Sequence, residues 1–525
     1  MNRTTKVLAV TAGLLVAAVT GCTDPTVAPK STVSSANVFS DPASYKAFLA
    51  RIYGGLIVTG QRGPDGNRDI ASIDEGFSQY LRLYWYLQEM PTEEAAIGWN
   101  DPGLPTLNTG TWAAANEMVN AMWYRVYFQV MLANEFLLET TDAKLAERGQ
   151  TSMQAEIATY RAEARFLRAL AYWHGLDLFG PRIPLVTEAD SKGATPPMPA
   201  AGTEVYDYVV SELLAIVNDL PPARTATSYA RATPPAAHML LAKLYLNAGI
   251  YTGTPNYAGA LSEASTVIAA GYTLNPVFRD NFGARNNLSN ELVFVAGQDG
   301  ANTQTWGGMT FLVHAGCGGG VTAASVGIDY CWGGYRMKSQ AYNWYSAGDG
   351  RASFFYTTGQ TAIVNSSGNY SEGILAPKFN NIGGQQTTMV DTDFPIFRLA
   401  DAYLIYAEAV VRGGGGTTVQ AETYFNALRQ RAFGNATHNL PASTLTSGSA
   451  AALDTILTER GRELLYEAQR RTDLIRFQRF ASGTYHWDLK NGSTPGTALL
   501  VGHDLYPIPA NELIANPNLT QNTGY

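Results

Sequence analysis

The spacing of apolar residues predicts that the middle of this chain is helical. Over 154–178, apolar or large side chains recur at steps of three and four, which places them on one face of a helix. The same spacing recurs over 206–220, 234–248 and 257–268, and Thr233 is a plausible N-cap in front of two prolines. These segments predict four successive helices, which Gly or Pro residues bring to an end, and a short linker with Gly and Pro precedes the fourth.

A further pair of helices is expected in the last quarter of the chain. Segments 398–411 and 419–433 carry the helical spacing, and the run of glycines at 413–416 breaks the first of them. Two antiparallel helices with small residues at their contact form the unit of a tetratricopeptide-like repeat. The repeats are degenerate and interrupted, so they predict a helical scaffold and not a regular solenoid.

Two long intervals lack this periodicity. Residues 58–112 and 297–395 are rich in Gly, Asn, Thr and aromatic side chains. Loops of this length in a compact domain are usually functional or disordered. Their aromatic content argues against disorder, so we expect these two intervals to carry the function.

The N-terminus predicts export and a lipid anchor. Two basic residues precede an apolar run at 7–19 that is too short to span a bilayer, and small residues then lead to Cys22. We expect 1–21 to be a lipoprotein signal peptide and Cys22 to carry the lipid, including palmitate. Residues 22–35, rich in Thr, Ser, Pro and Val, suit a flexible tether. The alternative is an ordinary secretory signal with a chance cysteine.

Composition narrows the classes of partner and chemistry. The chain has 525 residues and a formal charge of −8, which makes it a poor candidate for binding nucleic acid. No other stretch is long and apolar enough to cross a membrane. Besides Cys22, it has only Cys317 and Cys331, in a Gly-rich segment. In an exported chain we expect a disulfide between them, and the alternative is two free thiols.

The sequence contains no clear catalytic or metal-binding pattern. The six histidines lack metal-ligand spacing, and no nucleophile motif accompanies them. His174 falls on the apolar face of its helix and is expected to be a core residue. Segment 459–476 is dense in charge, and we interpret it as a structural ion-pair network in which Glu467 and Arg471 stand at i,i+4. No enzyme activity, cofactor or metal is predicted.

Aromatic side chains in the two long intervals are the best candidates for ligand contacts. Sugars stack their C–H-rich faces on aromatic rings, and their hydroxyls need polar side chains beside those rings. The alternative is that these rings only anchor the loops to the helices. The candidate ligand-binding residues are Trp99, Asn100, Asp101, Trp112, Trp306, Trp332 and Tyr335.

Several blocks of sequence together resemble the SusD/RagB family of outer-membrane nutrient-binding lipoproteins. In the first block Arg168-Ala169 and Tyr172 lead to Leu178-Phe179-Gly180, although Pro181 follows where family members often carry an acidic residue. The order of the blocks and the ending Gln-Asn-Thr-Gly-Tyr carry the resemblance over nearly the whole mature chain. The blocks are 163–188, 231–249, 398–432, 456–476 and 505–525.

The resemblance implies an all-α, mainly α SusD-like fold in which tetratricopeptide-like helix pairs support long, irregular, ligand-bearing loops. It implies a single domain over 36–525, with an N-terminal part at about 36–220 and a C-terminal part at about 280–525. The expected protein is anchored in the outer membrane by lipid and faces the cell surface. It would bind oligosaccharide or polysaccharide and deliver it to a SusC-like TonB-dependent transporter.

Three alternatives to this function remain open at the level of sequence. Members of the same fold also bind peptides or protein fragments. A surface hydrolase is disfavoured because the acid–base and nucleophile patterns are missing. A structural subunit of the transporter complex, without a ligand of its own, is the third.

Overall fold

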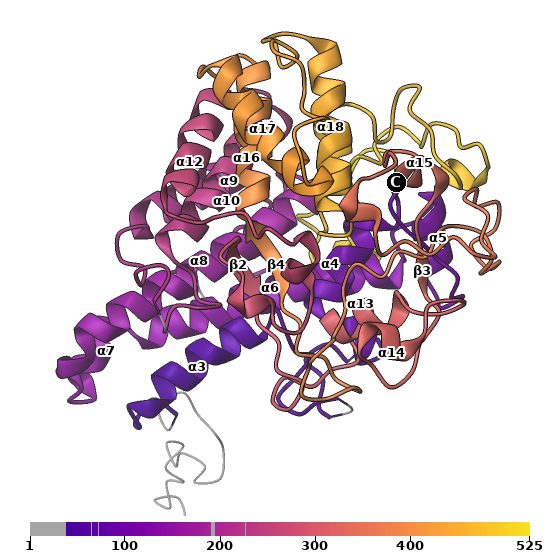
Figure 1. Cartoon of the computed structure of the whole chain (residues 1–525). Coiled ribbons are helices and arrows are strands. Elements are labelled where there is room, and N and C mark those ends of the chain that lie inside the picture. The colour runs from indigo at the N-terminus through magenta and orange to yellow at the C-terminus, as the bar shows by residue number, and fades with distance from the viewer. Residues whose placement is uncertain (1–37, 65, 72, 191–194, 226) are drawn as a thin grey trace, which may run out of the picture. The chain divides into compact units, whose positions relative to one another are not determined.

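The fold lies in one of two compact units. Contacts divide the chain into a short N-terminal unit, Met1–Ser44, and a main unit, Tyr45–Tyr525. The predicted signal peptide, Cys22 and the tether fall outside the described residues and stay predictions, as do the domain boundaries. The structure is a computed structural model (Figure 1), and the residues it describes are 38–64, 66–71, 73–190, 195–225 and 227–525.

Helices dominate the described residues, which confirms the predicted fold class. Strands are few and short. The helices are α3 (Ala43–Gly54), α4 (Tyr80–Glu89), α5 (Leu104–Thr109), α6 (Glu117–Glu139), α7 (Asp142–Glu147), α8 (Gln154–Phe179), α9 (Glu204–Ile216), α10 (Pro234–Leu246), α11 (Ala248–Thr252), α12 (Tyr257–Ala269), α13 (Gly308–Ala315), α14 (Ala323–Val326), α15 (Ser339–Tyr342), α16 (Leu399–Val411), α17 (Thr418–Phe433), α18 (Ala450–Leu464), α19 (Arg470–Arg476) and α20 (Ala510–Ala515). The strands are β1 (Ala96–Ile97), β2 (Leu292–Ala296), β3 (Tyr335–Arg336) and β4 (Phe394–Arg398).

The six helices that the spacing predicts are all present. Helix α8 packs on α9, α10 packs on α12, and α16 packs on α17, while α12 also packs on α16 and joins two of these pairs. In Figure 1 this stack of helices stands apart from the irregular segments around α13, α14 and β3. The pairs therefore form the scaffold, and the long intervals form the region beside it.

Local signals explain where these helices begin and end. Helix α8 ends at Gly180, whose φ of +88° is accessible to glycine and costly for other residues. Helix α10 starts with proline in its first turn, and Thr233 occupies the N-cap. The Thr233 side chain makes no capping hydrogen bond, however, so the fixed φ of the prolines is the effective start signal.

Two helices inside the first long interval, α4 and α5, were not predicted. All ten residues of α4 are buried. This short segment is dense in aromatic side chains, like the irregular interval around it, so its composition did not distinguish it as a helix. Helix α4 is the central support of the irregular region, because it contacts α6, α13 and α19.

The charge-dense segment at 459–476 forms a buried ion-pair network, as predicted. Arg398 pairs with Glu291, Glu463 and Glu467 at 2.7–2.8 Å, and all four side chains are inaccessible or nearly so. The neighbouring guanidiniums hold the pKa of Glu463 well below its usual range against the opposing effect of burial. Such pairing supports a structural role and not an acid–base one.

The expected pair between Glu467 and Arg471 is wrong. The helical path breaks between α18 and α19, where Tyr466 and Ala468 take positive φ values of 63° and 57°. Glu467 therefore pairs with Arg398 and Lys378, and Arg471 pairs with Asp177.

Two small antiparallel sheets join parts of the chain that are far apart in sequence. Strand β1 pairs with β3, so that Ala96 lies opposite Arg336 and Ile97 lies opposite Tyr335. Strand β2 pairs with β4. The first sheet brings the early long interval against the late one, and this contact positions the candidate site.

Candidate ligand-binding site

Three of the predicted tryptophans come together on the irregular region. The ring centroid of Trp332 lies 6.3 Å from that of Trp99 and 6.2 Å from that of Trp306. All three side chains are half-buried. Tyr330 joins them, with its centroid 6.4 Å from that of Trp332 and 47% of its surface exposed. We call Trp99, Trp306, Tyr330 and Trp332 the aromatic platform.

Trp99 is positioned by the β1–β3 sheet. The backbone N–H of Gly98, just past β1, donates to the carbonyl of Gly334 at 3.3 Å. The Trp99 ring packs edge-on against Phe311 of α13, with centroids 5.9 Å apart. The next two residues, exposed Asn100 and half-buried Asp101, place an amide and a carboxylate next to Trp99 in the chain.

Trp306 is held through both of its peptide groups. Its N–H donates to the Glu75 carboxylate at 3.2 Å, and its carbonyl accepts from the Arg82 guanidinium at 3.0 Å. Thr305 donates to the same carboxylate at 2.9 Å. Burial raises the pKa of Glu75, while these hydrogen bonds oppose the rise. The Arg82 guanidinium also lies 4.4 Å from the Phe311 ring centroid, so one buried cation ties the early interval to the late one.

Trp332 is fixed at the end of α13. Its N–H donates to the carbonyl of His314 at 2.9 Å, and Gly334 N–H donates to Ala315, also at 2.9 Å. The last carbonyls of a helix lack partners within the helix, and this segment supplies them. Cys331 is joined to Cys317 by a disulfide with the two Cα atoms 4.9 Å apart. The residue next to Trp332 is thereby tied to the chain just past α13.

Two of the predicted site residues do not belong to the platform. Trp112 is buried against Tyr506 and His503, with ring centroids 4.6 and 5.2 Å away. Tyr335 is fully buried, and its hydroxyl donates to the carbonyl of Leu312 at 2.7 Å. Both rings are covered on each face, so the prediction that they contact ligand is wrong. Chemical type and loop position alone could not separate them from the exposed rings.

Tyr330 was missed by sequence reasoning. It stands one residue before Cys331 and two before Trp332, inside the expected disulfide loop. That position next to a candidate ring was the only available signal. Its carbonyl accepts from a histidine side chain while its ring faces outward, and this separation cannot be inferred from sequence.

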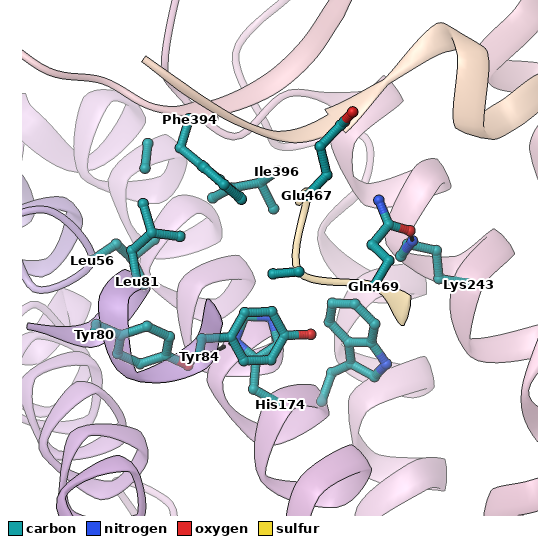
Figure 2. Close-up of a pocket in the computed structure, with 13 residues that line it drawn as sticks. Leu56, Tyr80, Leu81, Tyr84, His174, Lys243, Phe394, Ile396, Glu467 and Gln469 are labelled. Carbon is teal, nitrogen blue, oxygen red and sulfur yellow. Dashed lines mark hydrogen bonds between the residues drawn. The ribbon is translucent and has the colours of Figure 1, made fainter. Parts of the chain in front are cut away.

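One cavity elsewhere in the main unit is too small for a sugar. Figure 2 shows this cavity, which is enclosed by Tyr84, His174, Lys243, Glu467 and Gln469 with apolar neighbours. Its volume of about 30 Å³ suits roughly one water molecule. Burial and the nearby Lys243 lower the pKa of His174 to about 3, so this histidine is a neutral core residue, as predicted.

The described residues offer neither a metal site nor a membrane span. Within those ranges, no three His, Cys, Asp or Glu side chains are grouped to hold a metal ion. Among the same residues, no helix combines the length and the hydropathy needed to cross a bilayer.

A helical scaffold that presents a cluster of partly exposed rings on long loops defines a class of binding proteins. Comparison with known sequences identifies the family. A model described as "SusD family" matches residues 300–525, and one described as "Starch-binding associating with outer membrane" matches residues 92–246. The chain belongs to the SusD family. This family is one of binding proteins and not of enzymes, which agrees with the prediction from sequence.

Individual relatives support this assignment. The chain is 32% identical to the starch-binding protein SusD of Bacteroides thetaiotaomicron, over 90% of this chain and 91% of that protein. A SusD superfamily protein from the same organism has a TM-score of 0.70 at 21% identity, over 91% of this chain and 99% of that one. Surface glycan-binding protein A of B. thetaiotaomicron, solved with laminarihexaose, has a TM-score of 0.68 at 18% identity, over 92% and 99%. These two structural similarities show that the fold is shared and nothing further.

Proposed function

We propose that this protein binds an uncharged glycan on the aromatic platform and delivers it to a SusC-like TonB-dependent transporter. The convergence of Trp99, Trp306 and Trp332 from three separate segments carries the proposal. Partly exposed rings at these spacings can stack against successive sugar faces, and Asn100 and Asp101 can bind hydroxyls. The relatives named for starch binding and solved with laminarihexaose support a glucan as the first ligand to test.

The charges beside the platform favour a neutral ligand. Asp74 precedes the Glu75 that holds Trp306, Asp101 follows Trp99, and Asp329 precedes Tyr330. These three carboxylates are exposed or half-buried. A uronate or sulfated glycan would meet like charges there, which costs affinity.

The direct test is calorimetric titration of the mature chain with maltoheptaose, laminarihexaose and an oligogalacturonate. We expect a neutral glucan to bind and the oligogalacturonate to bind at least about tenfold more weakly. Trp332→Ala should weaken glucan binding, whereas Tyr403→Ala should not. Tyr403 is a matched control because it is a half-buried ring that stacks on Tyr424, 4.6 Å away, on α16 and α17.

Other outcomes of this titration distinguish the alternatives. Binding of a peptide pool, with no response to an array of neutral oligosaccharides, would contradict the glycan proposal and support the peptide alternative. Release of shorter sugars during incubation would support the hydrolase. Retention of the intact oligosaccharide is the expected result.

We further propose that Cys22 carries a lipid that holds the protein on the outer membrane, facing outward. The charged N-terminus, the apolar run and the small residues before Cys22 support this anchor. Cys22→Ser should abolish acylation and release the protein from the outer-membrane fraction. An acylated, membrane-bound Cys22→Ser protein would contradict the assignment.

Partnership with the transporter is tested in native membranes. Affinity capture in mild detergent should recover a large TonB-dependent β-barrel together with this protein. Capture of this protein alone, under conditions that retain other outer-membrane complexes, would count against the partnership and leave the glycan site untouched.

A further inference from the structure

One buried histidine makes several different contacts with the two platform rings that lie closest to the disulfide. His314 is on α13, and its side chain is fully buried. Its ring centroid lies 4.9 Å from that of Trp332 and 5.3 Å from that of Tyr330. Its Nδ1 lies 2.8 Å from the Tyr330 carbonyl, and its own carbonyl accepts the Trp332 N–H.

The partner of Nδ1 determines the tautomer of His314. A backbone carbonyl can only accept, so Nδ1 must carry the hydrogen. Burial lowers the pKa of His314, against the opposing effects of the Tyr330 carbonyl and the Asp329 carboxylate. At neutral pH the side chain is therefore a neutral imidazole that donates through Nδ1.

These contacts act on the parts of the platform that the disulfide does not reach. The bond between Cys317 and Cys331 restrains backbone next to Tyr330 and Trp332. It leaves the torsions of both side chains free. The imidazole, in contrast, packs against the Trp332 ring itself, and its Nδ1–H donates a hydrogen bond to the carbonyl of Tyr330.

We infer that His314 is a positioning residue for ligand binding: its Nδ1–H and its ring orient Tyr330 and Trp332 for stacking on a sugar. This inference rests on the proposed function of the aromatic platform. His314 is covered by the rings that it supports, and it acts on the ligand through them. A ring that must sit within a fraction of an ångström of its ligand gains affinity from such support, because less conformational entropy is lost on binding.

The chain contains a matched control. His503 is also buried, and its Nδ1 lies 3.0 Å from the carbonyl of Gly110. Its ring stacks on Trp112 with centroids 5.2 Å apart. His503 thus makes the same two kinds of contact outside the platform, a ring contact with a tryptophan and an Nδ1 hydrogen bond to a backbone carbonyl. Its substitution measures the purely structural effect of losing them.

The experiment compares His314→Leu, His314→Asn and His503→Asn by titration with maltoheptaose and laminarihexaose. Leucine keeps bulk but removes the donor, and the Asn amide can place an N–H near the position of Nδ1. We expect His314→Leu to weaken binding about five- to tenfold, and His314→Asn to stay within about threefold of the unmodified protein. His503→Asn should leave affinity unchanged.

A second measurement needs no ligand. The chain has nine tryptophans, so 5-fluorotryptophan labelling gives a resolvable ¹⁹F spectrum in which Trp332→Phe and Trp112→Phe assign two signals. In the unliganded protein, His314→Leu should shift or broaden the Trp332 signal and spare that of Trp112. His503→Asn should do the opposite.

The outcomes separate this inference from the proposed function. If the unmodified protein binds no neutral oligosaccharide, the proposed function fails, while the ¹⁹F spectra still decide whether His314 orients Trp332. An unchanged Trp332 signal in His314→Leu overturns the inference, as does affinity within about twofold of the unmodified protein. If His314→Leu does not fold, a folded His314→Asn with about tenfold weaker binding also overturns it.

Discussion

Two tryptophan–histidine pairs in this protein share two kinds of contact and differ in what covers the tryptophan. Trp112 stacks on His503, and Trp332 packs on His314. Each histidine uses Nδ1 to bind a backbone carbonyl. The far side of Trp112 is closed by the C-terminal segment, whereas Trp332 faces other half-buried rings. Similar local contacts thus belong to a closed cluster in one place and to a partly accessible ring in the other.

The comparison shows that the role of each tryptophan ring depends on what packs against it besides the histidine. Tyr506 lies 4.6 Å from Trp112, and Tyr525, the last residue of the chain, accepts a hydrogen bond from the Trp112 indole. A tryptophan with both ring faces covered and its N–H already hydrogen-bonded cannot stack on a sugar or donate to one of its hydroxyls. Trp332 keeps part of its surface accessible, which is the condition for stacking.

The largest expected effect is a loss of stability when Trp112, the tryptophan with both faces covered, is replaced. Trp112→Ala should lower the free energy of unfolding by about 3–5 kcal/mol, because it opens a cavity in a closed cluster. Glucan affinity of the folded protein should not change. Denaturant unfolding and calorimetric titration on the same sample measure both. A weakened affinity with native stability would reverse the roles assigned to the two pairs.

The disulfide distinguishes the two pairs, because it restrains the backbone next to Trp332 and not the backbone next to Trp112. Replacing Cys317 and Cys331 together by serine should cost up to about 3 kcal/mol, given a sequence separation of 14. Glucan binding should weaken as well, because the backbone next to Trp332 loses a restraint. Mass mapping of a non-reduced digest checks the bond itself. Two alkylatable thiols in the native exported protein would show that the bond does not form.

A smaller effect, on glucan affinity, is expected when Trp99 of the platform is replaced. Trp99→Ala should weaken glucan binding about ten- to hundredfold, equivalent to about 1–3 kcal/mol by analogy with base stacking. Its melting temperature should fall much less than that of Trp112→Ala, since Trp99 is only half-buried. Trp112→Ala is the control in the same titration. Unchanged affinity in Trp99→Ala, Trp306→Ala and Trp332→Ala would remove the platform as the binding site.

The smallest effect is a pH dependence that the two histidines share. Burial lowers the pKa of His314 and of His503 below the ordinary value of 6.5. Below pH 6.5 the unfolded chain takes up protons that the folded protein resists, so the free energy of unfolding falls as the pH drops toward the folded pKa.

His503→Asn removes one of these contributions. It should make the plot of unfolding free energy against pH shallower below about pH 6.5, without changing glucan affinity at neutral pH. Urea unfolding at a series of pH values measures the slope. An unchanged slope would mean that His503 is protonated equally readily in both states.

Sequence reasoning succeeded where one face of an element meets solvent. Helices α9, α12 and α17 alternate buried and exposed positions, and a glycine follows the ends of α12 and α17. It failed at α4, because this short helix is dense in aromatic residues and lies inside an irregular interval of similar composition. It also failed for Glu467 and Arg471, because a positive φ at Ala468 breaks the helical spacing between them.

The candidate site was predicted only in part, and for a related reason. Trp99, Trp306 and Trp332 were chosen by residue type and loop position, and the structure brings them together. The same criteria also selected Trp112 and Tyr335, which are buried. Exposure of a loop ring depends on segments hundreds of residues away, such as Tyr506 over Trp112.

By itself the sequence determined the helical scaffold, the family and the kinds of side chain available to bind a ligand. These follow from periodicity, turn residues and composition, which are local properties of the chain. Only the tertiary structure decided which rings form a surface, through the pairing of β1 with β3 and the closure of Trp112 by the C-terminus. The physical reason is that burial arises from contacts between segments remote in sequence, which no local pattern encodes.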